Sequence, residues 1–500
     1  QGANILDPVR LGEGYALFIN SLNHPTNSCN AFLAGETAMM GKEHFIKTFG
    51  VPLFTVSTGG SGGAYTSLQV ADEFPGLFDG VLISATFPDA LSIAYSGLDG
   101  HLLTHYFTVT DPTAFTDPEK VAVCGYKGIQ AFFDAANQSQ RTDPVPGRVD
   151  VPGYASAVWN AVVPMELRYD PVTNPHGARP TVFDVAHNIY GIDPSTGFAL
   201  RPFDNVGVQY GLEALNAGAI TPAQFLSLNE RIGGFDQDAN YVSQRATGDV
   251  GAIRRAQQGG ISLGGGGGLG AIPVFDTSGL FDEDMIYHYQ WYHFGVRQRL
   301  IDANGNAANH VMWRGGPNFA ELTNPTPESA ALVEAVTRES WAAFIRWVEA
   351  VAADHSRISQ RQRVIRNRPA DLVDGCWTKE LTPQFIAEPQ TWSREPDSAC
   401  NTLWPSYSNP RKVAGGPLAA NKFKCRLKPI NLADYAVSFT PAELDRLQGI
   451  FPNGVCDWSR RAVGQTGVVP FGSFGPSPVN LIFDVTGHEH GHDHDDGEED

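Results

Sequence analysis

The apolar and polar positions of the first 84 residues predict strands and helices in alternation. Short apolar runs at residues 13–20, 51–56 and 78–84 are typical of buried strands. Between them, residues 33–49 and 64–73 carry apolar side chains on one helical face. The order strand, helix, strand, helix, strand predicts a parallel sheet with crossover helices, and therefore an α/β fold.

A run of glycines, Gly264–Gly268, separates this opening from a second group of regular elements. Residues 87–263 show mixed short helices and polar loops without a strand period, which predicts an inserted cap. The glycine run could be a flexible hinge or a tight re-entry loop. Beyond it the pattern predicts a strand, a helix, a strand and a long helix, at residues 271–277, 284–303, 310–313 and 327–353.

These patterns divide the chain into five units. They are a first core part, a cap insertion, a second core part, a cysteine-containing C-terminal extension and a tail, at residues 1–86, 87–263, 264–356, 357–487 and 488–500. The tail holds four His and seven Asp or Glu residues, which predicts a disordered segment with loose metal affinity.

Composition narrows the classes of partner. A chain of 500 residues that is 42% hydrophobic can bury a large core in two or three structural units. Its formal charge of -19 repels phosphate backbones, so we expect no nucleic-acid partner. No apolar run reaches the length of a membrane span. The chain starts at Gln1 without a start Met or signal peptide, which fits either a processed chain or a fragment.

Six cysteines indicate the redox compartment, and none lies in a Cys-x-x-Cys or zinc spacing. Disulfides in a secreted or periplasmic protein are the favoured interpretation, and buried free thiols in a cytosolic protein are the alternative. We expect the four cysteines after residue 370 to pair with one another, because they crowd an irregular region. The six are Cys29, Cys124, Cys376, Cys400, Cys425 and Cys456.

The segment Gly59–Gly63 has the form Gly-x-Ser-x-Gly and stands between a predicted strand and a predicted helix. On such a turn a serine takes a strained backbone conformation, and small neighbours let strand and helix approach closely. We therefore predict Ser61 as a nucleophile and the Gly62 N–H as an oxyanion donor. A plain glycine-rich turn is the alternative. A phosphate-binding loop is disfavoured because no Lys follows.

The stretch from Gly59 to Gly80, with the Ile83–Pro88 segment after it, resembles the tannase and feruloyl-esterase group of α/β-hydrolases. It is most similar to a related family of uncharacterised function. Further similar segments are Ser21 to Asn23, Asn27 to Asn30, Asp204 to Gly211, Arg368 to Asp374 and Phe451 to Trp458. The resemblance implies an α/β-hydrolase-like parallel sheet with a large inserted cap, acting on esters.

The strand after the cap ends near a second candidate. Asp282 follows Gly279 by three residues, at the position where such folds place the acid that orients a histidine. Asp276, Glu283 and Asp284 are nearby rivals, and a solvated acidic turn is the non-functional alternative.

The base is harder to assign, because the loop at residues 314–326 contains no histidine. His288, predicted within the first turn or so of the helix after Asp282, is the first choice. His293, farther along that helix, and His24, after the first predicted strand, stay as alternatives.

Strand direction separates the other histidines from the nucleophile. His310 begins its predicted strand and His355 follows a helix that runs back, so both are expected at the far end of the sheet. Of the four histidines between residues 280 and 360, we expect His288 to lie closest to Ser61, within one hydrogen bond or one bridging water.

The second oxyanion donor has no candidate in the sequence. Capped hydrolases of this type have two or more strands and an oxyanion loop before the strand predicted at 13–20, where this chain has twelve residues. We expect that donor to come from a segment upstream of Gln1, in which case the chain is a fragment or one product of a cleavage.

These observations predict a secreted or periplasmic serine esterase that needs no cofactor. It would form an acyl-enzyme on Ser61 with a small-molecule or polymer-derived ester, and the cap would shape an apolar pocket. The alternative is a non-catalytic binding or structural protein that retains the hydrolase fold. Asp236-x-Asp238-x-Asn240 could start a structural calcium loop in the cap, although Tyr241 occupies the turn position and no Glu closes the loop.

Overall fold

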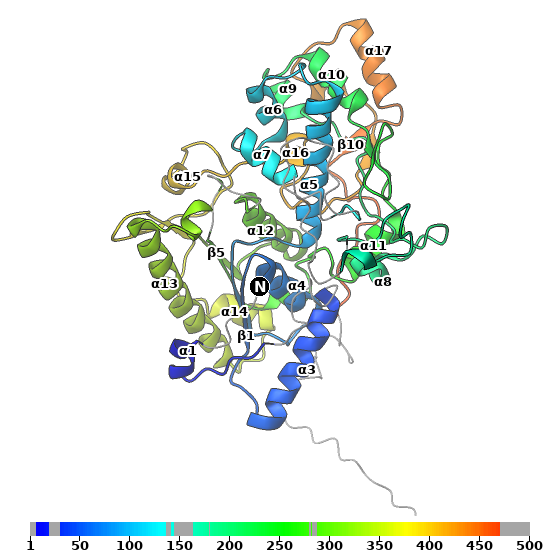
Figure 1. Ribbon diagram of the computed structural model, residues 1–500. Helices are drawn as coiled ribbons and strands as arrows, with labels where there is room; N and C mark the ends of the chain where they lie inside the picture. Colours follow the sequence, from blue (N-terminus) through cyan, green and yellow to red (C-terminus); the bar gives the residue numbers. More distant parts are fainter. Residues whose placement is uncertain are drawn as a thin grey trace, which may run out of the picture.

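The computed structural model describes residues 7–19, 31–136, 142–144, 164–179, 181–279, 282 and 288–470. Figure 1 shows the labelled strands and their covering helices in the lower part of the view, most helices of residues 90–231 above them, and the helices at 187–190 and 250–258 level with the sheet. No helix of the described residues is long and apolar enough to cross a membrane.

The centre of the fold is a six-stranded sheet with the order β1-β2-β5-β6-β7-β8. The pairs from β1 to β7 are parallel, and β8 is antiparallel to β7. The fold is therefore mixed α/β with a mostly parallel sheet. The strands are Val56–Gly60, Gly80–Ser84, Val274–Ser278, His310–Arg314, Gly375–Trp377 and Phe385–Ala387.

Helices cover both faces of this sheet. On β2, Val81 and Ile83 pack against the face covered by α4 (Gly62–Glu73) and α12 (Trp291–Asn304). Leu82 points the other way, toward α13 (Pro327–Ala352), because successive side chains of a strand alternate between faces. The helix α3 (Ala31–Phe49) packs on α4. The helices predicted at 33–49 and 64–73 are thus present.

The first two predicted strands differ from the structure. The strand expected at 51–56 begins at Val56 and runs through Gly60, which pairs with Ser84. Glycine is depleted in strands, so the low strand propensity of Gly59 and Gly60 led the prediction to end the strand too early. Residues 15–19 form no regular element; Tyr15 packs on Trp341 with ring centroids 5.3 Å apart. Among the described residues β1 pairs only with β2, so the apolar run at 15–19 joins no ladder there, and its Leu17, Phe18 and Ile19 are exposed.

The predicted cap region and the C-terminal extension share one apolar core. The elements of the first are α5 Ala90–His105, η1 Tyr106–Thr110, α6 Asp117–Cys124, α7 Ile129–Ala136, α8 His187–Tyr190, α9 Leu212–Asn216, α10 Pro222–Arg231, β3 Gly234–Phe235, β4 Tyr241–Val242 and α11 Val250–Gln258. Those of the second are α14 Gln360–Arg366, α15 Ala399–Leu403, α16 Pro410–Val413, β9 Arg426–Lys428, α17 Pro441–Ile450 and β10 Val455–Asp457. A short helix near the start, α1, spans Pro8–Gly12.

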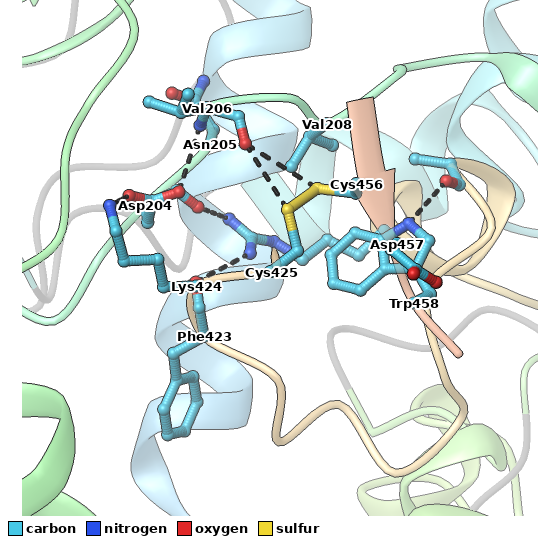
Figure 2. Close-up of a disulfide and its surroundings, with 12 residues drawn as sticks. Asp204, Asn205, Val206, Val208, Phe423, Lys424, Cys425, Cys456, Asp457 and Trp458 are labelled. Atoms are coloured by element: carbon cyan, nitrogen blue, oxygen red, sulfur yellow. Dashed lines mark hydrogen bonds and ion pairs between the residues drawn. A yellow bond between two sulfur atoms is a disulfide. The ribbon is translucent and has the colours of Figure 1, made fainter. Parts of the chain in front are cut away.

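Ion pairs and disulfides fix the extension. Arg411 binds Asp99 of α5 with Nε and Oδ2 2.6 Å apart. Figure 2 shows the disulfide between Cys425 and Cys456 beside the Val206 carbonyl. The second disulfide joins Cys376 of β7 to Cys400 of α15, so the prediction that these four cysteines pair with one another is confirmed. Cys124 is a buried free thiol, and Cys29 lies outside the described residues.

The strands β7 and β8, which lie in the predicted extension, continue the central sheet. The register places Arg314 of β6 opposite Cys376 of β7. The Cys376–Cys400 disulfide is therefore attached to the central sheet itself.

The glycine run is a tight re-entry loop. The Asp72 carboxylate, at the end of α4, accepts the N–H groups of Gly265 and Gly267 at 2.7 Å each. A Cβ at Gly267 would lie 2.0 Å from the Asp72 carbonyl oxygen, and one at Gly268 would lie 2.4 Å from the Ala71 oxygen. Only glycine fits these positions, which decides between the two alternatives for the run.

Glu73, next to Asp72, is buried without a partner. Neither of its carboxyl oxygens has a hydrogen-bond partner among the described residues. Its side chain fills the space beside Gly260, where a Cβ would lie 1.8 Å from Oε1. Burial, and secondarily the charge of Asp72, raises the pKa of Glu73 well above its usual value.

This carboxyl predicts a pH-dependent cost to stability. Above the ordinary pKa of 4.5, the unfolded chain ionises at Glu73 while the folded protein keeps the proton, so rising pH favours unfolding. Glu73→Gln should therefore stabilise the protein at neutral pH, with a gain that grows by up to about 1.4 kcal/mol per pH unit. Near pH 3 to 4, roughly, the gain should disappear because both states are then protonated. Thermal unfolding of both proteins at a series of pH values measures this difference in stability.

The control for this prediction is Glu395→Gln, because the Glu395 side chain is 68% exposed. That variant should follow the wild type at every pH. A Glu73→Gln protein that is no more stable at pH 8 than at pH 4, relative to wild type, would contradict the assigned burial of this proton.

Candidate active site

Ser61 lies on a strained turn between β1 and α4. Its φ of 57° and ψ of -117° are outside the common regions for a residue with a side chain. The Ser61 N–H donates to the Ser84 carbonyl of β2 at 3.0 Å, and the Ser61 carbonyl accepts the Ala64 N–H at 3.0 Å. Backbone bonds on both sides of the serine thus hold this conformation.

The neighbouring glycines allow the turn to form. A Cβ at Gly59 would lie 2.5 Å from the carbonyl carbon of Gly63, because strand and helix cross closely here. A Cβ at Gly60 would lie 2.9 Å from Ser84 Oγ. Gly62 is the first residue of α4, so its N–H has no carbonyl to bind within the helix. These are the features of a nucleophile elbow.

The structure brings His288 to this serine. The His288 Nε2 and Ser61 Oγ are 2.9 Å apart, a hydrogen-bond distance. One side of the imidazole packs on Phe87, with ring centroids 4.8 Å apart, and Phe87 in turn makes an edge contact with Tyr292. The histidine is buried, and these aromatic contacts restrict its ring.

His288 does not lie in the helix where the sequence places it. The helix α12 begins at Trp291, so His288 precedes it by three residues. The predicted helix extends too far toward its N-terminus at least at His288 and Tyr289, which form no regular element. Because His288 lies outside the helix, its side chain can extend across the strand ends to Ser61.

Asp282 is buried close to the same edge of the sheet. Its Oδ2 accepts the Gln290 N–H at 3.2 Å, and its Oδ1 has no hydrogen-bond partner among the described residues. Burial raises the pKa of Asp282 to about 7, although the Gln290 N–H and the charge of Arg314 oppose the rise. An unpartnered carboxylate oxygen at this place could accept the N–H of an imidazole.

Two residues of this site, Gln290 and Arg314, were missed in the sequence analysis. The Gln290 side chain donates through Nε2 to Ser278 Oγ and accepts from Arg314 Nε at 3.2 Å. Arg314 ends β6 and is fully buried. A charged residue directly after an apolar strand was the available signal, because the carboxyl ends of parallel strands meet at one edge.

The rival acid Asp276 is engaged elsewhere. Its Oδ1 accepts from His293 Nδ1 and from Thr86 Oγ1, both at 2.8 Å, and its Oδ2 lies 3.6 Å from His310 Nε2. These contacts, led by those of His293, hold the pKa of Asp276 below its usual value in spite of burial. His293 Nε2 accepts the Thr86 N–H at 3.3 Å, so neither histidine is directed at Ser61.

The remaining sequence candidates take no part in the described site. His355 is exposed beyond the end of α13. His24, Glu283 and Asp284 lie outside the described residues.

The predicted calcium loop is closed by protein contacts. Asp236 Oδ1 accepts the N–H groups of Asp238 and Asn240 at 2.9 and 2.8 Å. The Asp238 carboxylate binds Arg179 at 2.7 Å and the Tyr169 hydroxyl at 2.9 Å. Within the part of the chain that the structure describes, no group of three or more His, Cys, Asp or Glu residues could hold a metal ion. The calcium ion therefore stays an untested expectation.

Comparison with known proteins gives a family and no closer relative. No curated protein and no solved structure shows significant similarity to the chain. A family model described as "Tannase-like family of unknown function (DUF6351)" matches residues 1–467. The match includes the strand ends that carry Ser61, Asp282, His288 and Arg314. The chain therefore belongs to this tannase-like family of unknown function.

Proposed function

We propose that the protein is a serine hydrolase that cleaves carboxylic esters through an acyl-enzyme on Ser61, with an α/β-hydrolase-type core. The observation that carries the proposal is the 2.9 Å contact between His288 Nε2 and Ser61 Oγ on a strained strand-to-helix turn. The tannase-like family supports ester hydrolysis as the reaction class.

The first half-reaction follows from this contact. As Ser61 Oγ attacks the ester carbonyl carbon, His288 Nε2 takes the hydroxyl proton. The carbonyl becomes an oxyanion, which the Gly62 N–H at the start of α4 stabilises. When the oxyanion collapses, the alcohol leaves with the proton from His288, and the acyl group stays on Ser61.

Water completes the cycle. His288 takes a proton from a water molecule, which attacks the acyl carbon, and then returns the proton to Ser61 Oγ as the carboxylic acid departs. In this scheme the unpartnered Oδ1 of Asp282 comes to accept the Nδ1–H of His288 when the ring is protonated, and so stabilises the imidazolium. The residues of 87–263 serve as the cap over the strand ends, and the two disulfides support a location outside the cytosol.

A fluorophosphonate probe tests the nucleophile directly. Only an activated serine reacts with it, so wild-type protein should be labelled on Ser61, as mapped by peptide mass spectrometry. The non-catalytic alternative predicts no labelling at all. Ser340→Ala is the matched control, because Ser340 is a buried serine of α13 on the opposite face of the sheet.

Ser61→Ala should lower the hydrolysis of p-nitrophenyl esters by a factor on the order of 10⁴ to 10⁶ and leave the melting temperature nearly unchanged. The change removes the attacking oxygen and little packing, since Ser61 is partly exposed. Comparable turnover by Ser61→Ala and wild type would refute the assignment.

The pH profile tests Asp282. The scheme needs an ionised Asp282 and a neutral His288, so kcat/KM should fall as the pH drops below about 7, the pKa to which burial raises this carboxyl. Asp282→Asn should reduce kcat by a factor on the order of 10⁴, because an amide cannot stabilise the imidazolium. Steady-state kinetics between pH 5 and 9, roughly, measures both effects. An Asp282→Asn enzyme with near wild-type kcat would assign the acid elsewhere.

A further inference from the structure

Gln290 forms hydrogen bonds with three different residues of the candidate site. Its backbone N–H donates to Asp282 Oδ2 at 3.2 Å. Its side-chain Nε2 donates to Ser278 Oγ, the last residue of β5, and its Oε1 accepts from Arg314 Nε, the last residue of β6. The residue thus connects the proposed acid to the carboxyl ends of two adjacent strands.

These hydrogen bonds are buried away from solvent. Gln290 is 1% exposed, and Asp282 is 2% exposed. Hydrogen bonds between buried polar groups restrict geometry more than exposed ones, because no water can replace a lost partner. A change in the Gln290 side chain therefore displaces the backbone on which Asp282 and, two positions away, His288 depend.

Arg314 fixes the far side of Gln290. Its Nη1 donates to Asn401 Oδ1 at 2.7 Å and to Gln390 Oε1 at 3.4 Å, and its Nη2 donates to Ser406 Oγ at 2.9 Å. With the bond from Nε to Gln290, every nitrogen of the guanidinium has a partner. Burial lowers the pKa of Arg314 only to about 10, so the group stays a cation at neutral pH.

We infer that Gln290 is a positioning residue, anchored by Arg314, that sets the relative placement of Asp282 and His288 and thereby the activation of Ser61. This rests on the proposed function. Its hydrogen bonds reach Asp282, Ser278 and Arg314, so its contribution is to the geometry of the acid and the base. A misplacement of about 1 Å in such a pair can lower the rate by about 100-fold.

Gln290→Leu tests this placement. Leucine has a similar volume but neither side-chain bond, so kcat should fall by about 100-fold while KM changes less than about 3-fold. The rate of fluorophosphonate labelling should fall by the same factor. The ring resonances of His288, followed by NMR on protein with isotopically labelled histidine, should shift as well, and this measurement needs no turnover.

Gln290→Glu is the conservative variant. A carboxylate can still accept from Arg314 Nε, so kcat at its optimum should recover above that of Gln290→Leu. Its negative charge raises the pKa of the neighbouring Asp282, so the acid side of the pH–rate profile should move to higher pH.

Gln257→Leu is the matched control. Gln257 is a similarly buried glutamine of α11, with side-chain bonds to the Thr466 N–H and the Asn421 carbonyl. It should lose stability without a change in kcat, pH profile or His288 resonances.

The results separate the two proposals. Wild-type protein that resists fluorophosphonate and cleaves no ester refutes the proposed function; unshifted His288 resonances in a folded Gln290→Leu protein then also refute the positioning role. If wild type is labelled but Gln290→Leu keeps wild-type kcat and resonances, only the positioning role fails. A fall in kcat that Gln257→Leu reproduces in proportion to lost stability overturns it too.

Discussion

The close crossing of β1 and α4 is the constraint on which the candidate site depends. With Gly59 and Gly63 in backbone contact, the chain must reverse at Ser61 in a conformation that costs on the order of 1–3 kcal/mol. The bond from the Ser61 N–H to Ser84 holds that conformation from the neighbouring strand. Among the described residues β1 is an edge strand, and the turn lies at its carboxyl end, the side of the sheet where residues that follow the other parallel strands also lie.

The C-terminal extension also contributes contacts near the strand ends. Arg314 is in register with Cys376, and the disulfide partner Cys400 precedes Asn401, which accepts from Arg314 at 2.7 Å. The extension thus supplies hydrogen-bond acceptors for a cation that would be costly to bury alone. Since Arg314 also binds Gln290, a disulfide far along the chain is connected through these contacts to the residue two positions after His288.

The sequence predicted those parts of the fold that depend on local chemistry. The glycines around Ser61 predicted the turn, and the apolar spacing of α4 and α13 predicted these helices, because both signals depend on residues close together in the chain. The prediction from sequence failed where the contacting residues lie far apart along the chain. Residues 15–19 have a strand's composition, but they form no strand, and Tyr15 packs on Trp341 instead. Likewise Gln290 has no local pattern, because its role depends on an arginine 24 positions away.

The two buried acids near the strand ends show how placement decides chemistry. Asp276 lies within β5, between His293 and His310; the His293 N–H bonds its Oδ1, and the two histidines together hold its pKa low in spite of burial. Asp282 lies beyond the strand, with a backbone N–H on one oxygen and none on the other, and its pKa rises to about 7. An acid of that kind gains most from a positive charge formed beside it, because a new cation offsets the burial that raised its pKa. A transient imidazolium is such a cation, so the environment of Asp282 suits a group that acts during a reaction, while that of Asp276 suits a permanent structural contact.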